Sequence, residues 1–311
     1  MSGEVSGFTI GDPVLDGQDA RGRWCRRRSS TASSRRRRAR VRGRGFNGDG
    51  TPTRGENRMG LLDHKTAVIT GANSGIGLAT AERFLAEGAA RVFITGRRQP
   101  ELDAAASTLG PRVTAVRGDV GTPEDLDRLY AEVAAAGTGL DIVMANAGST
   151  RVARLGEITD DDLDALLTTN VKGVVYTVQK ALPLLNDGAS VILTGSTTAD
   201  RGRPGLSIYA ASKAAVRSLA RAWANELAGR NIRVNVIVAG STATPGSDAL
   251  AAQTDPDASI EEFRAGRIGT IPLGRFAEPT EIANAAVFLA SDLSSFTTGS
   301  TVTADGGFNQ V

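Results

Sequence analysis

Residues 66–77 read TAVITGANSGIG, a short apolar run that leads into three closely spaced glycines. The run is typical of a buried strand, and the apolar spacing of residues 76–87 predicts a helix directly after the glycines. Glycines at such a corner let the backbone approach a pyrophosphate, while the helix N-terminus offers free N–H groups. The spacing is GxxxGxG rather than GxGxxG, and glycines also occur where they only relieve a tight corner. We predict that this turn binds a dinucleotide through Gly71, Asn73, Ser74, Gly75, Ile76 and Gly77.

Strand and helix patterns alternate over the rest of residues 59–311. Apolar runs predict further strands at residues 91–95, 113–116, 140–144, 189–194, 232–238 and 300–303. Helical patterns cover residues 100–109, a segment that begins at residue 122, and residues 159–185, 207–228 and 279–290. Continuous apolar strands separated by helices predict a parallel sheet that is covered on both faces. The predicted fold class is therefore α/β, a single domain built on a doubly wound, seven-stranded, Rossmann-type sheet.

One long segment, residues 240–274, shows no clear period and is rich in Ala, Asp, Thr and Gly. A long segment of weak structure inside a domain is usually a lid or a binding loop, although it can be a merely tolerated insertion. We predict an irregular substrate loop here.

The N-terminal 58 residues differ in composition from the rest of the chain. Fourteen arginines and six acidic residues give residues 1–58 a formal charge of +8, whereas residues 59–311 carry −6. Such a segment is predicted to be disordered, because it has too little apolar surface to offset its ordering entropy. A basic arm that binds nucleic acid has this composition. A targeting segment is a second interpretation, although a secretory signal is disfavoured because an apolar h-region is missing, and a transit peptide would have fewer acidic residues. The favoured interpretation is a start codon placed too far upstream, with Met59 as the true start.

The rare residue types exclude several kinds of chemistry. The single cysteine, Cys25, excludes an internal disulfide framework, and the single histidine, His64, leaves little room for a histidine triad or a metal cage. No metal site is predicted. No apolar run is long enough for a transmembrane helix, and a cytoplasmic location is expected.

Polar residues follow three of the predicted strands, at the edge of the sheet where ligands bind. Arg97 and Arg98 follow the second strand, and no acidic residue lies in residues 91–100. An arginine at this position is suited to the 2′-phosphate of NADP, so we predict NADP in preference to NAD, although two solvated arginines would look the same. Further candidate cofactor contacts follow the third and fourth strands, at Asp119, Val120, Asn146, Ala147 and Gly148.

A second constellation has the residue types needed for proton transfer. Tyr209 and Lys213 are four residues apart at the start of a predicted helix, so they lie on one face. A lysine cation lowers the pKa of a neighbouring tyrosine, which then exchanges protons near neutral pH. Ser196 ends the fifth strand 13 residues before Tyr209, and Asn170 lies in the preceding helix.

These motifs together resemble the short-chain dehydrogenase/reductase family, which includes 3-oxoacyl reductases and glucose dehydrogenases. The resemblance covers residues 59–311 and rests on TGANSGIG (70–77), DV (119–120), NAG (146–148), Asn170 in TNVKG, YAASK (209–213) and GSTVTADGG (299–307). It implies an NAD(P)-dependent oxidoreductase acting on an alcohol/carbonyl pair, usually as a homotetramer, with a homodimer as the other possibility.

The resemblance also implies a role for each residue of the second constellation. Tyr209 exchanges the proton with the substrate oxygen, and Ser196 orients that oxygen. Lys213 lowers the pKa of Tyr209 and binds the nicotinamide ribose, and Asn170 holds a water. Gly240, Thr242 and Thr244 are expected at the nicotinamide end. The sequence departs from the family pattern at two backbone positions, Ala145 and Ala239.

Other functions and the substrate stay open at the level of sequence. A dinucleotide-sensing regulator and a nucleic-acid-associated protein that uses the basic tail are the alternatives, and the second is disfavoured. A hydrolase is disfavoured because Ser196 has no histidine nearby in sequence. A small carbonyl compound or alcohol is the expected substrate. Arg201 and Arg203 would suit an anionic substrate, but they could equally be solvated charges of a loop.

Overall fold

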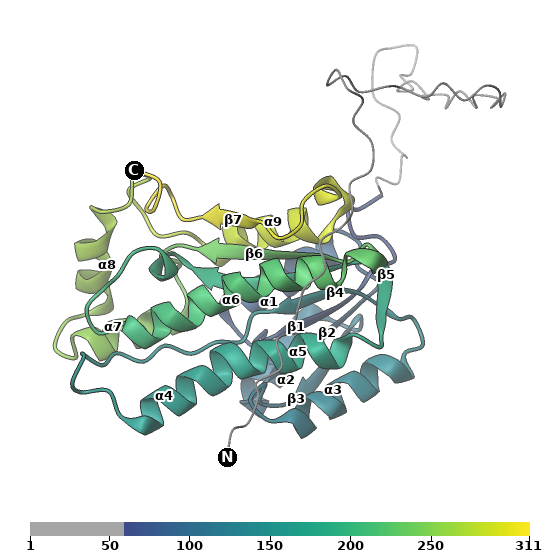
Figure 1. Ribbon diagram of the computed structural model, residues 1–311, viewed down its shortest axis with the longest axis horizontal. Coiled ribbons are helices and arrows are strands. Elements are labelled where there is room, and N and C mark those ends of the chain that lie inside the picture. The colour runs from purple at the N-terminus through teal and green to yellow at the C-terminus, as the bar shows by residue number, and fades with distance from the viewer. Residues whose placement is uncertain (1–58) are drawn as a thin grey trace, which may run out of the picture. The chain divides into compact units, whose positions relative to one another are not determined.

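The computed structural model describes residues 59–311, in which seven parallel strands form one sheet between two layers of helices (Figure 1). The strand order is β3-β2-β1-β4-β5-β6-β7, so the direction of winding reverses between β1 and β4. This confirms the doubly wound α/β fold. The strands are β1 (Thr66–Thr70), β2 (Arg91–Gly96), β3 (Val113–Arg117), β4 (Leu140–Ala145), β5 (Leu185–Ser196), β6 (Arg233–Ala239) and β7 (Thr301–Ala304). The predictions for residues 1–58, including the start at Met59, lie outside the described residues.

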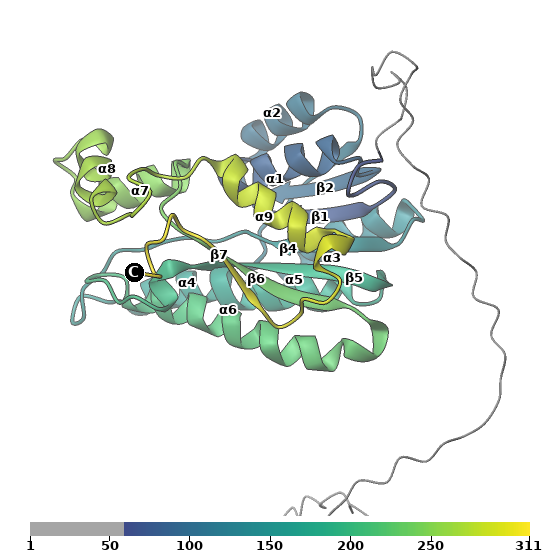
Figure 2. The ribbon, with the colours of Figure 1, turned by 90° about the horizontal axis from the view of Figure 1, so that it is seen from above.

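Helices cover both faces of the sheet (Figure 2). One layer consists of α1 (Gly75–Ala86), α2 (Gln99–Leu109) and α9 (Pro279–Ala290). The other consists of α3 (Pro123–Ala135), α4 (Asp160–Leu167), α5 (Gly173–Ala181) and α6 (Ser207–Glu226). Short 3₁₀ turns occupy Thr197–Ala199, Ala228–Arg230 and Asp292–Ser294. None of the helices in this part of the chain is long and apolar enough to cross a membrane.

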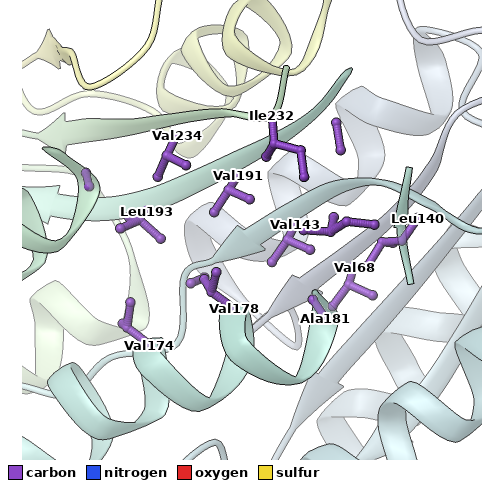
Figure 3. Packing of buried hydrophobic residues seen from close by; sticks show 14 of the residues in the cluster. Val68, Leu140, Val143, Val174, Val178, Ala181, Val191, Leu193, Ile232 and Val234 are labelled. Carbon is purple, nitrogen blue, oxygen red and sulfur yellow. The ribbon is translucent and has the colours of Figure 1, made fainter. Parts of the chain in front are cut away.

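Strands β1 to β6 contribute side chains to two hydrophobic cores, one on each face of the sheet. In β1, Val68 packs into the core under α3, α5 and α6, whereas Ala67 and Ile69 pack into the core under α1, α2 and α9. Figure 3 shows Val174 and Val178 of α5 facing the valines and leucines of the central strands. Because both faces are covered, all five residues of β1 are buried, which explains why three consecutive apolar residues stand at its centre.

The prediction of one continuous helix over residues 159–185 is wrong. The segment is α4, then a π-helical turn at Thr168–Lys172, then α5, and Leu185 already belongs to β5. The turn places Asn170 in the interior, where its amide group bonds to the backbone of Ser149 and to the Ser212 hydroxyl. These bonds come from other parts of the chain, so local periodicity does not reveal the interruption.

The prediction of an irregular segment over residues 240–274 is also wrong. It contains two helices, α7 (Pro245–Thr254) and α8 (Ile260–Ile268), at the end of the sheet where the strands terminate (Figure 1). The Thr244 hydroxyl accepts a bond from the Ser247 amide at 3.1 Å, and a capping box begins α8. Both helices have little buried surface, so the apolar period that reveals other helices is weak here.

We expect Phe84→Ala to lower the free energy of unfolding by about 3–5 kcal/mol, because it leaves a cavity in a close-packed core. Phe84 is fully buried between α1 and the sheet. Urea denaturation measures the change. Leu155→Ala is the control, since that side chain is 93% exposed and its loss is expected to cost less than about 0.5 kcal/mol. Equal losses in the two variants would contradict the packing described here.

Candidate active site

A cavity of about 450 Å³ lies at the carboxyl ends of the strands and includes residues that follow β1 and β4, where the winding reverses. Open α/β sheets bind their ligands at such a point. Every predicted site residue lines this cavity except Gly77 and Asn170. The lining set is Gly71, Asn73, Ser74, Gly75, Ile76, Arg97, Arg98, Asp119, Val120, Asn146, Ala147, Gly148, Ser196, Tyr209, Lys213, Gly240, Thr242 and Thr244.

The loops after β1 and β4 approach each other so closely that side chains are excluded. Gly71 has a φ of +65°, and a Cβ there would lie 2.8 Å from the Cα of Ala147. A Cβ on Gly77 would lie 2.4 Å from the Gly71 carbonyl oxygen and 2.6 Å from the Asn146 amide nitrogen. Gly77 therefore does not line the cavity. Its lack of a side chain lets α1 pack closely against Gly71 and Asn146.

Asn146 and Thr70 tie the two loops together. The Asn146 amide nitrogen donates to the carbonyl oxygens of Thr70 at 3.0 Å and Gly71 at 3.2 Å. The Thr70 hydroxyl in turn accepts from the backbone N–H groups of Asn146 and Ala147, each at 3.1 Å. Asn146 therefore shapes the turn rather than offering its donors to a ligand.

The N-terminus of α1 fits a dinucleotide pyrophosphate. Its first turn contains no acidic residue, and the Ser74 side chain does not cap it. The first N–H groups of a helix have no acceptor within the helix, and the helix dipole adds positive charge there. Gly75 and Ile76 line the cavity at this point, so a phosphate can reach the N–H groups.

The arginines after β2 both have carboxylate neighbours, one local and one from the end of β3. Arg98 pairs with Glu101 one turn along α2 at 2.6 Å. Arg97, whose side chain is 64% exposed, lies 3.7 Å from the Asp119 carboxylate at the end of β3. The absence of acids from residues 91–100 thus does not leave this edge free of negative charge.

The second constellation surrounds the other end of the cavity. The Lys213 amine is buried and donates to the Thr194 carbonyl oxygen at 2.9 Å, and it lies 5.8 Å from the centre of the Tyr209 ring. The Ser196 hydroxyl oxygen accepts a bond from the Thr198 hydroxyl at 2.8 Å. Tyrosine, serine and lysine thus meet at one surface, as their spacing predicts.

The pKa of Tyr209 differs from the sequence expectation. Burial raises the pKa of its hydroxyl, and hydrogen bonding with Ser196 and Thr150 only partly offsets this. Burial also lowers the pKa of Lys213 to about 8, which weakens the cationic form that was expected to stabilise tyrosinate. In the protein alone, therefore, the protonated tyrosine is favoured.

Asn170 lies behind the cavity. Its amide oxygen accepts from the Ser149 N–H at 2.8 Å, and its amide nitrogen donates to the Ser149 carbonyl at 2.9 Å and the Ser212 hydroxyl at 3.1 Å. The side chain is thus used to hold the loop after β4 against α6. The role of Asn170 in holding a water stays a prediction.

Comparison with known proteins identifies the family. A family model described as enoyl-(acyl carrier protein) reductase matches residues 71–309. The oxidoreductase asL5 of Sarocladium schorii is 48% identical over 252 residues, which cover 80% of this chain and 98% of that protein. The chain belongs to the short-chain dehydrogenase/reductase family. It is therefore an oxidoreductase of a family that uses a nicotinamide dinucleotide.

Other members of the family are similar along the same part of the chain. The 3-oxoacyl-(acyl-carrier-protein) reductase of Thermotoga maritima is 36% identical over 250 residues, 79% of this chain and 98% of that protein. A glucose/ribitol dehydrogenase from Brucella melitensis superposes with a TM-score of 0.74 at 32% identity and covers 81% of this chain and 99% of its own. The names of these family members describe different substrates, so the family does not define the substrate here.

The two departures from the family pattern leave the sheet intact. Ala145 and Ala239 are the last residues of β4 and β6, and they pair with Leu193 and Ala304 in the neighbouring strands. Neither substitution removes a polar group from the cavity's second constellation.

Sequence reasoning missed several cavity residues. Thr150 lies two residues after the NAG motif, a spacing that gives a weak signal for its contact with Tyr209. Arg267 and Phe276 come from the α8 region and line the cavity without any motif that marks them.

We expect Gly77→Ala to weaken dinucleotide binding by about tenfold, because overpacking of this kind costs about 1–3 kcal/mol and displaces the α1 N-terminus. Fluorescence titration with NADPH measures the dissociation constant. Gly229→Ala is the control, since a Cβ there meets nothing within 4 Å. An unchanged dissociation constant in the Gly77 variant would show that this contact does not position the helix.

Proposed function

We propose that the protein interconverts a carbonyl compound and the corresponding alcohol. The observation that supports this most strongly is that Ser196, Tyr209 and Lys213 share one cavity with the glycine turn after β1. A bound nicotinamide dinucleotide supplies the hydride for reduction or accepts it in the reverse direction. The relatives described above are named as oxidoreductases, reductases or dehydrogenases, which favours this function over a regulatory or nucleic-acid-associated role.

We assign each part of the cavity a part of the dinucleotide according to the charges that line it. The α1 N-terminus would hold the pyrophosphate, and Arg97 and Arg98 would face the adenosine ribose. Lys213, with Gly240, Thr242 and Thr244 from the β6 loop, would hold the nicotinamide half. In this proposal residues 59–311 form a single domain. Its helices α7 and α8 lie beside the part of the cavity that would hold the substrate.

Tyr209 is the proposed proton donor and acceptor. Its raised pKa keeps the hydroxyl protonated, as a carbonyl oxygen requires when it becomes an alcohol. Hydrogen bonds with Ser196 and Thr150 favour the opposite, ionised form, so they assist the reverse reaction. Ser196 is also placed to donate to the substrate oxygen. Asn170 then acts as a positioning residue for the loop above Lys213, since a Cβ on Gly148 would lie 3.4 Å from both side chains.

The family is typically oligomeric, and we propose a homotetramer or a homodimer for this chain. β7 ends the sheet with one edge unpaired among the described residues, and Leu293 and Phe296 just before it are exposed. A contact between two copies would cover such a surface. The cytoplasmic location stays a prediction.

We expect Tyr209→Phe to reduce kcat for carbonyl reduction by about 100-fold or more, the scale of general acid–base catalysis, with little change in the NADPH dissociation constant. The substitution removes only the hydroxyl. NADPH oxidation with a panel of ketones measures turnover. Tyr176→Phe is the control, because that tyrosine packs on α5 against the core. Near-full activity without the Tyr209 hydroxyl would refute the proposed chemistry.

We also propose a preference for NADP(H), which rests on the exposed Arg97 and Arg98. A guanidinium group pairs well with a 2′-phosphate, and the phosphate would compete with Asp119 for Arg97. Arg97→Asp should shift the NADPH-to-NADH ratio of kcat/KM towards NADH by about ten- to a hundredfold. Arg91→Asp, the same change at the opposite end of β2, should not. A wild type that uses NADH better would show that the preference is wrong.

A further inference from the structure

The wall of the cavity at Phe276 belongs to a small cluster of three phenylalanine rings. Phe276 and Phe308 are buried in a small cluster with Ile271, and Phe263 packs against it. Phe276 also lines the cavity. This cluster joins the α8 region to the C-terminal residues and is separate from the two cores that flank the sheet.

Each of the three rings is faced by at least one arginine. Guanidinium groups lie over the rings as cation–π pairs: Arg201 and Arg203 over Phe308 at 4.5 and 4.8 Å, Arg264 over Phe276 at 5.8 Å and Arg267 over Phe263 at 4.8 Å. Stacking fixes the plane of a guanidinium while leaving its N–H donors at the edge available. The positive charge at this wall is therefore oriented rather than mobile.

Two of these arginines already have polar partners. Arg201 donates to the Phe308 carbonyl oxygen at 2.9 Å. Arg264 pairs with the Asp248 carboxylate at 2.7 Å. The stacking and the hydrogen bonds of these two guanidinium groups are therefore explained by a structural role.

The other two, Arg203 and Arg267, line the cavity. Within residues 59–311 neither side chain has a carboxylate at ion-pair distance or a hydrogen-bond acceptor. Asp119 is the single carboxylate residue among the described lining residues, and it lies beside Arg97. The substrate end of the cavity is thus lined by cations without a compensating anion.

Arg203 has lost part of its hydration. It is half-buried, and burial, followed by repulsion from Arg201, lowers the pKa of its guanidinium. A charged group that is partly removed from water and has no anion nearby is costly to the folded protein. A ligand that carries an anion would offset this cost. Arg203 and Tyr209 line the same cavity, so one ligand can contact both residues.

We propose that the carbonyl substrate carries an anionic group, a carboxylate or a phosphate ester, that binds Arg203 and Arg267 while its carbonyl oxygen lies at Tyr209. This inference rests on the proposed function of the same site. It adds a specificity determinant: both guanidinium groups can donate pairs of N–H bonds to oxyanions, which a neutral ketone cannot accept with the same strength.

The test compares kcat/KM for matched pairs of carbonyl compounds that differ in charge. Levulinate is compared with methyl levulinate, acetoacetate with methyl acetoacetate, and dihydroxyacetone phosphate with dihydroxyacetone, each with saturating NADPH. We expect the anionic member to be preferred by about tenfold or more in at least one pair, and the pair concerned shows whether a carboxylate or a phosphate is bound.

The double variant R203M/R267M should abolish that preference, since methionine keeps the aliphatic bulk and removes the N–H donors. Arg91→Met removes one positive charge at the opposite end of the sheet and should leave the ratio as in the wild type. Equal use of anionic and neutral members by the wild type in all three pairs, or an undiminished preference in the double variant, would overturn the inference.

Calorimetry separates this inference from the proposed function. Levulinate and dihydroxyacetone phosphate are titrated into the full chain with saturating NADP⁺, so no turnover is needed. Binding of either anion that is lost in R203M/R267M supports the inference even if no ketone is reduced, in which case the proposed function fails alone. Absence of binding by both anions, with neutral ketones reduced, overturns the inference and leaves the proposed function standing.

Discussion

The close approach of the chain after β1 to the chain after β4 is the constraint on which the site depends. Asn146 donates to the carbonyl oxygens of Thr70 and Gly71, and Gly77 must lack a side chain for α1 to pack against them. Because parallel strands open outward where the winding reverses, a crevice exists there, and these bonds set its depth. The N-terminus of α1 is thereby directed into the crevice, with its unpaired N–H groups available to an anion.

The cavity is asymmetric in charge, and this asymmetry gives its two ends different tasks. At one end Arg97 and Arg98 are exposed, and the carboxylates of Asp119 and Glu101 offset part of their charge. At the other end Lys213 is buried, and Arg203 and Arg267 have no carboxylate partner among the described residues. Electrostatic interactions are stronger where water is excluded, so we expect the end of the cavity at Tyr209 to discriminate between ligands by charge more sharply than the exposed end does.

The sequence predicts the features that local pattern controls. Buried strands such as β1 and the glycine turn after it follow from an apolar run and from backbone sterics. It does not predict features that distant contacts impose. The π-helical turn at Asn170 depends on Ser149 and Ser212, and α7 and α8 bury too little surface to show a period. Arg267 lines the cavity because of where α8 lies, and no short sequence motif predicts that position. The pKa of Tyr209 likewise depends on burial that spacing alone does not give.

A crystal structure of the protein with NADP⁺ tests the central claim most directly, namely that one cavity holds both the dinucleotide and the proton-transferring tyrosine. The account predicts electron density for the pyrophosphate against the N–H groups of Gly75 and Ile76, for the 2′-phosphate beside Arg97, and for the nicotinamide at the end of the cavity that contains Tyr209 and Lys213. A dinucleotide bound elsewhere, or one whose nicotinamide lies away from Tyr209, would contradict it.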